Sequence, residues 1–190
     1  MDLFSDLLGC ERCCLHATRT NLVFGSGNPK APVMFVGEAP GHEEDVAGLP
    51  FVGPSGKLLT CLMKRAGILR ESVYIANLLK CRPPGNRDPE PSEIKECFPF
   101  LEKQIATIRP KVLVALGRHA VCRLSLHWGP MNVLIGKTDL VHETPDGIIP
   151  VMALWHPSFL LRNIRSESPE MKALFQDFVQ RLADLKAKYL

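Results

Sequence analysis

The chain has 190 residues, of which 46% are apolar and 23% are charged, and its formal net charge is +3. This is ordinary globular composition with enough chain to bury a core, and it excludes a uniformly basic surface, so any nucleic-acid footprint must be local. No apolar run approaches the roughly 20 residues of a membrane span, and the first residues, MDLFSD, lack the positive segment of a secretory signal. We therefore expect a single cytoplasmic domain over residues 1–190, with no membrane partner.

The first strong feature along the chain is a Cys-x-x-Cys pair, formed by Cys10 and Cys13. In a chain without a secretory signal, metal binding explains such a pair better than a disulfide does. Cys81 and Cys97 lie further along, and four thiolates without a well-placed histidine suit either zinc or a [4Fe–4S] cluster. The spacing alone does not choose between the two, and Cys14 beside Cys13 leaves the register of the pair open.

The stretch around which we expect the function to be organised follows the first predicted strand, Val33–Val36. A short apolar run of this kind is typical of a buried strand in a parallel sheet. It leads into Gly37-Glu38-Ala39-Pro40-Gly41, and an open α/β sheet usually binds its ligand beyond the carboxyl end of such a strand. The glycines would let backbone amides approach a ligand closely. The alternative is an ordinary strand-to-loop turn with solvated acidic side chains.

Strands and helices alternate along the rest of the chain. A helix is predicted from a cap at Ser55 to a stop at Gly67. The later predicted elements are a strand over 73–79, a helix over 92–108, a strand over 111–116, a helix over 118–126, β-type runs over 132–155 with a turn at 144–147, a last strand over 150–155 and a closing helix from 168. Pro99 predicts a break just after Cys97, because an interior proline loses a hydrogen bond and clashes with the preceding turn.

The cysteines Cys61 and Cys122 fall within these helical patterns among apolar neighbours, which is typical of buried, inert thiols. The alternation of strands and helices predicts a parallel or mostly parallel sheet that is covered on both faces. The loops after the first, second and last strands then leave the same edge of the sheet. This arrangement places Glu38, Asn77 and His156 together.

Several motifs, taken together, carry a family resemblance. In chain order they are CERC at 10–13, VFGSGNP at 23–29, GEAPGHEED at 37–45, PFVGPSGKLL at 50–59, YIANLLKCRPPGNRDPEP at 74–91 and HPSFLLRN at 156–163. In this order and spacing they are highly specific, and the chain resembles a family-four, iron–sulfur uracil-DNA glycosylase. The resemblance implies an α/β fold, a three-layer αβα sandwich around a four-stranded parallel sheet. It also implies a DNA repair enzyme that hydrolyses the N-glycosidic bond of uracil, releasing free uracil and leaving an abasic site.

The resemblance further names the metal ligands. It implies that Cys10, Cys13, Cys81 and Cys97 hold a [4Fe–4S] cluster, and it sets Cys14 aside. In this family the cluster is taken as structural, holding the loops that meet DNA, rather than as a redox centre in the reaction.

For base recognition, the resemblance implies that Phe51 stacks on the uracil ring of a nucleotide flipped out of the DNA. Asn77 would offer its amide N–H to uracil O4 and its carbonyl to N3–H, a pattern opposite to that of cytosine. The N–H of Ala39 is a further contact to the ring. Glu44 matches the position thought to exclude the thymine methyl group.

For catalysis, His156 resembles the family histidine that hydrogen-bonds uracil O2 as negative charge grows on the departing base. Glu38 can position water and favour the cationic sugar. Without the motifs, Asn77 would more often be a strand-end turn residue, Phe51 a core aromatic and His156 a structural histidine.

For DNA binding, basic side chains near an extruded nucleotide would hold phosphates without regard to sequence. The candidates are Lys80, Arg82 and Arg87 in the cluster loop and Arg162 after the HPS motif. Leu160 or Leu161 could wedge into the gap that the flipped base leaves. The expected partner is uracil-containing DNA, single- or double-stranded, and the protein is expected to act as a monomer.

A related branch traps uracil-DNA covalently through a histidine in a basic insertion after the Asn-Arg pair. Residues 87–92 continue here without that insertion, which favours a hydrolase that turns over. The alternatives are a non-catalytic or covalently trapping uracil-DNA-binding module of the same fold, and a zinc-stabilised hydrolase of small nucleotides.

Overall fold

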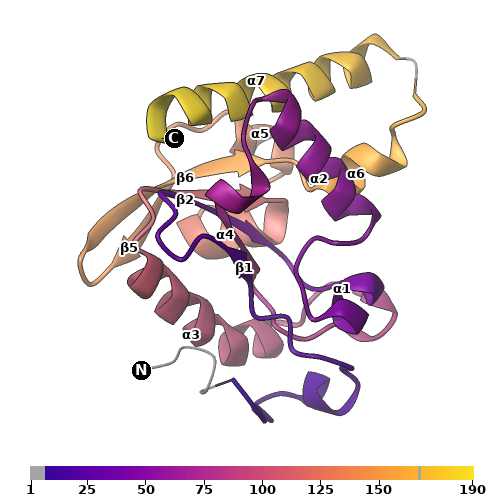
Figure 1. Cartoon of the computed structure of the whole chain (residues 1–190), viewed down its shortest axis with the longest axis vertical. Coiled ribbons are helices and arrows are strands. Elements are labelled where there is room, and N and C mark those ends of the chain that lie inside the picture. The colour runs from indigo at the N-terminus through magenta and orange to yellow at the C-terminus, as the bar shows by residue number, and fades with distance from the viewer. Residues whose placement is uncertain (1–6, 167) are drawn as a thin grey trace.

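The computed structural model describes residues 7–166 and 168–190, which are built around a sheet with helices on both faces (Figure 1). The strands are β1 (Ser26–Gly27), β2 (Val33–Gly37), β3 (Tyr74–Asn77), β4 (Val112–Leu116), β5 (Val141–Thr144) and β6 (Gly147–Leu154). The α-helices are α1 (His42–Ala47), α2 (Pro54–Arg65), α3 (Pro91–Ile108), α4 (Arg118–Ser125), α5 (Met131–Ile135), α6 (Pro157–Arg162) and α7 (Pro169–Tyr189). Short 3-10 segments are η1 (Cys14–Ala17), η2 (Arg70–Ser72) and η3 (Pro84–Asn86).

Within the described residues the strands form one six-stranded mixed sheet in the order β1-β3-β2-β4-β6-β5. Neighbours among β3, β2, β4 and β6 run parallel, whereas β1 and β5 pair antiparallel at the two edges. The α/β class is confirmed, but the expectation of a four-stranded parallel sheet is not, because the sheet is wider and mixed. The predicted turn at 144–147 does form a hairpin, and this hairpin adds β5 to the sheet.

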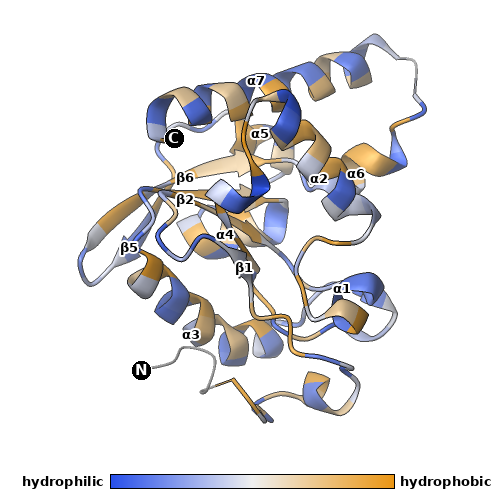
Figure 2. Cartoon of the chain, in the orientation of Figure 1, coloured by the Kyte–Doolittle hydropathy of each residue, from blue (hydrophilic) through white to orange (hydrophobic). Residues whose placement is uncertain are grey.

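Each face of the sheet carries its own apolar core, because the central strands are apolar at every position. In β2, Met34 and Val36 pack with α3, α4 and α5, while Val33 and Phe35 pack with α2, α6 and α7. Figure 1 shows α2, α6 and α7 on one side of the sheet and α3 on the other. Apolar and polar residues alternate along α7 (Figure 2), as expected of a helix with one face on a core.

The predicted helix break just after Cys97 is wrong. Helix α3 runs without interruption from Pro91 to Ile108, with Pro99 inside it. An interior proline costs about 3 kcal/mol. Phe98 and Leu101, on either side of it, are buried in the core, and full burial of each such side chain contributes about 1.5–3 kcal/mol. Burial therefore outweighs the lost hydrogen bond.

Two other local predictions also need correction. The predicted β-type runs begin at residue 132, but residues 132–135 belong to helix α5 (Met131–Ile135) instead. Its buried residues Met131, Leu134 and Ile135 have helical spacing, and this spacing is too short to be distinctive in the sequence. Helix α2 begins at Pro54 with Gly53 as its cap, so Ser55 lies inside the first turn rather than at the cap.

The parallel strands β2, β3, β4 and β6 end at one edge of the sheet, and the loops that follow them meet there. None of the helices in the described ranges is long and apolar enough to cross a membrane. The opening MDLFSD, on which the expected lack of a secretory signal rests, lies outside the described residues.

Candidate active site

The carboxyl edge of the sheet borders a cavity of about 480 Å³. This volume lies within the range of small-molecule sites, about 300–1,000 Å³. The structure brings all the predicted base-site residues together along its walls. They are Glu38, Ala39, Glu44, Phe51, Asn77 and His156.

The inner end of the cavity depends on a glycine. Gly37, the last residue of β2, pairs with Asn77, the last residue of β3. A Cβ atom at Gly37 would meet the side-chain oxygen of Asn77 and would approach Cζ of Phe51 to 2.5 Å. Any side chain at this position would therefore displace the Asn77 amide or the Phe51 ring.

The Asn77 side chain is buried with an unused acceptor. Asn77 is 1% exposed, and among the described residues its Oδ1 has no hydrogen-bond partner. An unsatisfied buried acceptor costs about 1–3 kcal/mol. The main-chain oxygen of Asn77 accepts a hydrogen bond of 2.9 Å from Nζ of Lys80. This bond holds the end of β3 in place. The buried side-chain oxygen of Asn77 is therefore available to a hydrogen-bond donor on a ligand.

Phe51 forms one wall of the cavity from a strained backbone. Its φ of 52° lies in the left-handed region, which is unusual for an aromatic residue. Two contacts hold this turn in place. The Arg70 guanidinium donates to the main-chain oxygen of Pro50 at 2.6 Å, and the absence of a side chain at Gly56 lets α2 pack directly against the Phe51 backbone. The Phe51 ring centroid lies 5.9 Å from that of His156.

The Glu44 carboxylate joins two loops of the site. Its Oε1 accepts the backbone N–H groups of Val52 and Gly53 at 3.0 and 2.8 Å, and its Oε2 accepts that of Gly41 at 3.1 Å. Glu44 thus ties the loop after β2 to the loop that carries Phe51.

The ring of His156 is held in one orientation at the end of β6. Its Nδ1 accepts the backbone N–H of Ser158 at 3.2 Å and lies 2.8 Å from the Ser158 hydroxyl. Burial lowers the pKa of His156, so the ring is neutral at pH 7 and its proton sits on Nε2. Gly117, with φ of 88°, gives the ring room, because a Cβ there would lie 2.9 Å from Cβ of His156.

Glu38 has a partner that the sequence analysis missed. Nδ1 of His119 lies 2.6 Å from Oε2 of Glu38, and its Nε2 lies 3.9 Å from the exposed carboxylate of Asp88. The hydrogen bond to Glu38 raises the pKa of His119. The loop after β4 leaves the same edge as the others, so the topology alone could have drawn attention to His119.

The four predicted metal ligands surround a second, smaller cavity. Cys10, Cys13, Cys81 and Cys97 all line it. Because all four thiols border this one cavity, they are the residues that could hold a metal group here.

Hydrogen-bond donors around these sulfur atoms suit an anionic group. The backbone N–H of Lys80 donates to Sγ of Cys97 at 3.2 Å, and the Arg19 guanidinium donates to Sγ of Cys81 at 3.5 Å. Burial raises the pKa of Cys97 to about 11, so the free thiol stays protonated at pH 7.

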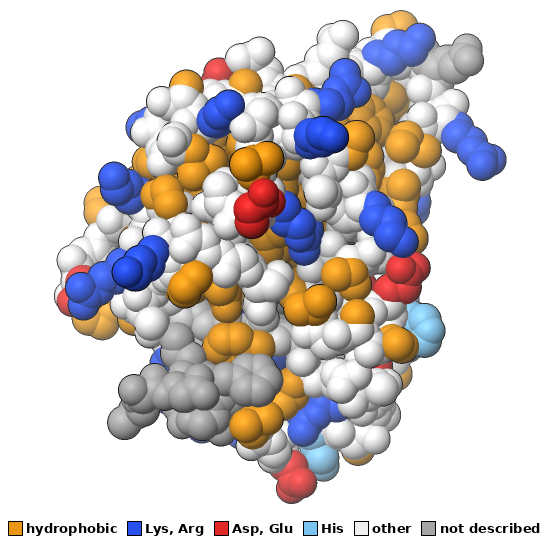
Figure 3. Space-filling view, in the orientation of Figure 1, with side chains coloured by type: hydrophobic (Ala, Val, Ile, Leu, Met, Phe, Trp, Pro, Cys, Tyr) orange, Lys and Arg blue, Asp and Glu red, His pale blue; other side chains and the backbone are white. Residues whose placement is uncertain are grey.

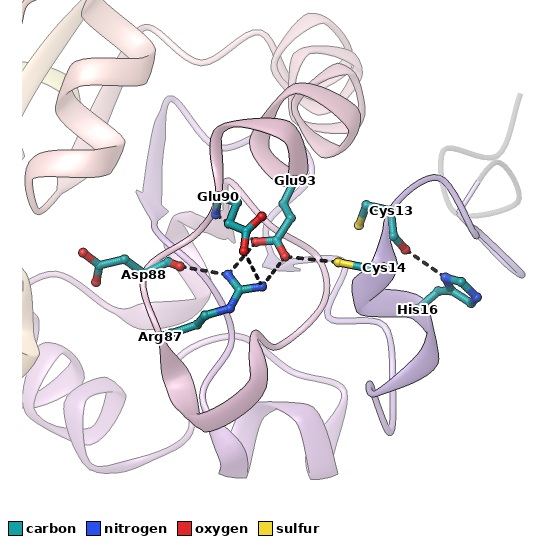
Figure 4. A network of polar contacts seen from close by, with 7 residues as sticks. All are labelled: Cys13, Cys14, His16, Arg87, Asp88, Glu90 and Glu93. Atoms are coloured by element: carbon teal, nitrogen blue, oxygen red, sulfur yellow. Dashed lines mark hydrogen bonds and ion pairs between the residues drawn. The ribbon is translucent and has the colours of Figure 1, made fainter.

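Cys14 belongs to a different network, which Figure 4 shows. Its thiol donates to Oε1 of Glu93 at 3.4 Å, and it does not line the cavity of the four cysteines. Glu93 is buried and binds the Arg87 guanidinium through both oxygens, at 2.5 and 2.9 Å. This hydrogen bond to Arg87 lowers the pKa of Glu93. The network links the segment after Cys13 to the loop after β3.

Three of the basic residues predicted to bind DNA are hydrogen-bonded within the protein. Arg87 lines the cavity, but its guanidinium is engaged by Glu93. Arg82 lies outside the cavity lining and bonds to Asn86 and His42. The prediction for Lys80 is wrong, because Lys80 is completely buried and cannot reach a phosphate.

Arg162 is exposed at the rim of the cavity, as is Arg118, which the sequence analysis did not single out. Neither makes an ion pair with the described residues. On the face shown in Figure 3, Lys and Arg side chains are spread over the surface rather than gathered in one patch.

Two apolar predictions also need correction. Leu160 is completely buried against α2 and α7, so it cannot act as a wedge, whereas Leu161 is partly exposed. Cys122 is buried as predicted, but Cys61 is exposed. The motif does not reveal which of two adjacent leucines turns outward, and apolar neighbours on a helix do not reveal which way the Cys61 side chain turns.

Comparison with known proteins gives a consistent result. The sequence model of the uracil DNA glycosylase superfamily matches residues 24–183. The type-4 uracil-DNA glycosylase of Archaeoglobus fulgidus is 40% identical over 98% of this chain and 93% of its own length. Those of Pyrobaculum aerophilum and Thermotoga maritima are 50% and 48% identical, over 87% and 83% of this chain and 87% and 81% of their own lengths.

The role of Glu44 as a tie between loops predicts a contrast with its neighbour Glu43. Glu44→Ala should lower the free energy of unfolding by about 1–3 kcal/mol, because three backbone N–H groups lose their acceptor. Glu43→Ala removes only an exposed ion pair with Lys57 and should change it by less than about 0.5 kcal/mol. Urea unfolding of both variants measures the difference, and equal effects would contradict the assignment.

Proposed function

The chain belongs to the uracil DNA glycosylase superfamily, and we propose that it is a uracil-DNA glycosylase of the type-4 kind, a single domain over residues 1–190. It hydrolyses the N-glycosidic bond of uracil in DNA, releases free uracil and leaves an abasic site for base excision repair. The observation that carries the proposal is the unpaired, buried Oδ1 of Asn77 beside the Phe51 ring, at the inner end of a cavity of suitable size.

Recognition in this proposal rests on a flipped base that lies against Phe51 with its edge toward Asn77. Uracil offers an N3–H donor to Oδ1 and an O4 acceptor to the side-chain N–H, which satisfies the orphaned oxygen. Cytosine offers an N3 acceptor and an N4 donor, so it would leave both groups unpaired. The burial of Asn77 and its unpaired Oδ1 support this discrimination.

The substituents of the pyrimidine ring meet the loop after β2. Ala39 lines the cavity and offers its backbone N–H to the ring. Glu44 restricts the space near C5, where thymine carries its methyl group. Because three backbone N–H groups hold its carboxylate, the Glu44 side chain keeps its position when a ligand approaches.

Bond cleavage sends an electron pair onto uracil and leaves positive charge on the sugar. The neutral His156 donates its Nε2–H to uracil O2, where negative charge develops, and Ser158 keeps the ring in the required tautomer. The Glu38 carboxylate faces the cationic sugar and accepts a proton from the water that attacks C1′. The role of His156 as donor from Nε2 is supported by its Nδ1, which accepts the backbone N–H of Ser158.

Uracil-containing DNA, in single or double strands, approaches along the rim of the cavity, and the protein acts as a monomer. Among the predicted basic residues, Arg162 has the side chain least occupied by ion pairs and hydrogen bonds with the described residues. We therefore propose that it holds a phosphate next to the flipped nucleotide. Leu161, rather than the buried Leu160, would fill the gap in the base stack. Arg82 and Arg87 support the loop and make weaker contributions to DNA binding.

We propose that Cys10, Cys13, Cys81 and Cys97 hold a [4Fe–4S] cluster. The cluster supplies no reaction step, and its role is to join the N-terminal segment, the loop after β3 and helix α3. The four thiols that line one cavity, the donors from Lys80 and Arg19 to their sulfur atoms and the similarity to type-4 relatives support this proposal.

The function is tested by incubating the protein with a uracil-containing oligonucleotide and a matched thymine oligonucleotide. Free uracil and an abasic site are expected from the first, with no base released from the second. A denaturing gel of the same reaction distinguishes the alternatives. No adduct should survive, whereas a stable protein–DNA adduct, or binding without uracil release, would refute the hydrolase.

The pocket geometry predicts different consequences for its two polar residues. Asn77→Asp should slow uracil excision strongly and relax the discrimination against cytosine, because an ionised carboxylate can only accept hydrogen bonds and repels O4. Each reversed contact should cost about 1–3 kcal/mol. His156→Ala should slow cleavage while leaving the choice of base largely intact, since both pyrimidines carry O2. Single-turnover excision of uracil and cytosine measures both effects, and a wild-type uracil rate in Asn77→Asp would refute the assignment.

The ligand assignment predicts a contrast between two adjacent cysteines. Cys13→Ala should lose iron and the brown visible absorption of the cluster, because a ligand is removed. Cys14→Ala should keep both, because the thiol of Cys14 is directed to Glu93 instead. Iron analysis and the visible spectrum of the purified variants decide between them. Equal iron loss in both variants would reverse the register.

A further inference from the structure

His119 stands beside the proposed chemistry without a role in it. It is the second residue of α4, it lines the same cavity as Glu38 and His156, and it is only partly exposed. Its Nδ1 lies 2.6 Å from Oε2 of Glu38. This hydrogen bond connects the loop after β2 to the start of α4. The two residues therefore follow different strands of the sheet, β2 and β4.

The bond engages only half of the Glu38 carboxylate. Oε1 of Glu38 makes no hydrogen bond with the described residues, while Oε2 is held by His119. A carboxylate that is not tied at either oxygen can rotate about its side-chain torsions. Fixing one oxygen therefore also fixes the direction of the other, and small errors in such positions are costly to catalysis.

We propose that His119 is a positioning residue for the hydrolytic step, in which its Nδ1–H holds Oε2 of Glu38 and leaves Oε1 for the attacking water. The inference rests on the proposed function. In this step the C1′–N1 bond breaks and its electron pair leaves with uracil. The water oxygen forms a bond to C1′, and one water proton passes to Oε1 of Glu38. The uracil anion is hydrogen-bonded by His156 and takes up a proton from solvent after release.

The charged groups around His119 keep the required proton on Nδ1. Glu38 and Asp88 face the two ring nitrogen atoms, and Arg118 on the same helix opposes them. The hydrogen bond to Glu38 is the main cause of the raised pKa of His119. A raised pKa means that the protonated form persists to a higher pH than in an ordinary histidine, which favours Nδ1–H as the donor to Glu38.

The same three side chains offer another chemistry that a test has to separate. One atom each from Glu38, Asp88 and His119 lies within 4.8 Å of the others, a spacing that could hold a divalent cation. A cation there would occupy the oxygen of Glu38 that this proposal reserves for His119 and water. The two arrangements are therefore mutually exclusive at Glu38.

The experiment compares single-turnover uracil release by the wild-type protein with that of His119→Ala, His119→Asn, Glu38→Gln and the double variant Glu38→Gln/His119→Ala. Asparagine is the matched control, because its side-chain nitrogen falls close to the position of Nδ1. His119→Ala should be about 10- to 100-fold slower, and His119→Asn should recover most of the rate. In the Glu38→Gln background, loss of His119 should change the rate by no more than about twofold, because His119 acts through Glu38. The affinity for the abasic product and the melting temperature should stay close to wild type.

A second readout does not depend on turnover. Titration of the imidazole signals by NMR should give a His119 pKa that falls toward the ordinary value in Glu38→Gln, since the partner that raises it is lost. An unchanged His119 pKa would overturn the proposal, and so would a His119→Ala rate equal to that of the wild type. An equal slowing by His119→Ala in the presence and absence of Glu38 would also overturn it.

Metal dependence gives the remaining outcome. Uracil release that is unaffected by EDTA supports the positioning role, whereas release that EDTA abolishes and added Mg²⁺ or Zn²⁺ restores would overturn it in favour of a cation site. Absence of uracil release by the wild-type protein would instead refute the proposed function itself, which separates the two failures.

Discussion

The pairing of Gly37 with Asn77 is the constraint on which the whole site depends. Parallel strands of matched register end side by side, and here the last residue of each faces the other. Because Gly37 has no side chain, the Asn77 amide and the Phe51 ring can both lie against the strand end. Three features keep this small space open. They are the left-handed turn at Phe51, the close packing of Gly56 against that turn, and the hydrogen bonds from the same loop to the Glu44 carboxylate.

A single buried lysine connects the proposed metal site to the base site. Lys80 donates from Nζ to the main-chain oxygen of Asn77 and to Gln104, while its backbone N–H donates to Cys97. A buried ammonium is expensive unless it is hydrogen-bonded, and burial lowers the pKa of Lys80 to about 8. Lys80 therefore links Sγ of Cys97 to the end of β3. Through this link the proposed metal site is mechanically connected to the proposed base site.

The sequence allowed the four parallel strands, their common edge and the residues that gather there to be predicted, because apolar runs and strand-end glycines are local signals. It did not reveal the short edge strand β1. It did not allow the directions of individual side chains to be predicted. Lys80 was taken for a surface cation although it is buried, and of the two leucines considered as a wedge, Leu160 belongs to the core. The continuity of α3 through Pro99 is likewise decided by packing, which acts between segments far apart in the chain. His119 was overlooked because its importance comes from a contact with Glu38 across 81 positions.

The order of the segments has a consequence for how the protein is made. Glu38, Phe51 and Asn77 come from the first half of the chain, but His156 follows β6, and α7 covers one apolar face of the sheet only after that. A nascent chain on the ribosome can thus pair β2, β3 and β4 while it still lacks the histidine and the last helix. The proposed catalytic set is completed only once the segment after β6 has been synthesised. Fragments released early would contain the base-reading residues without the group that activates the leaving base.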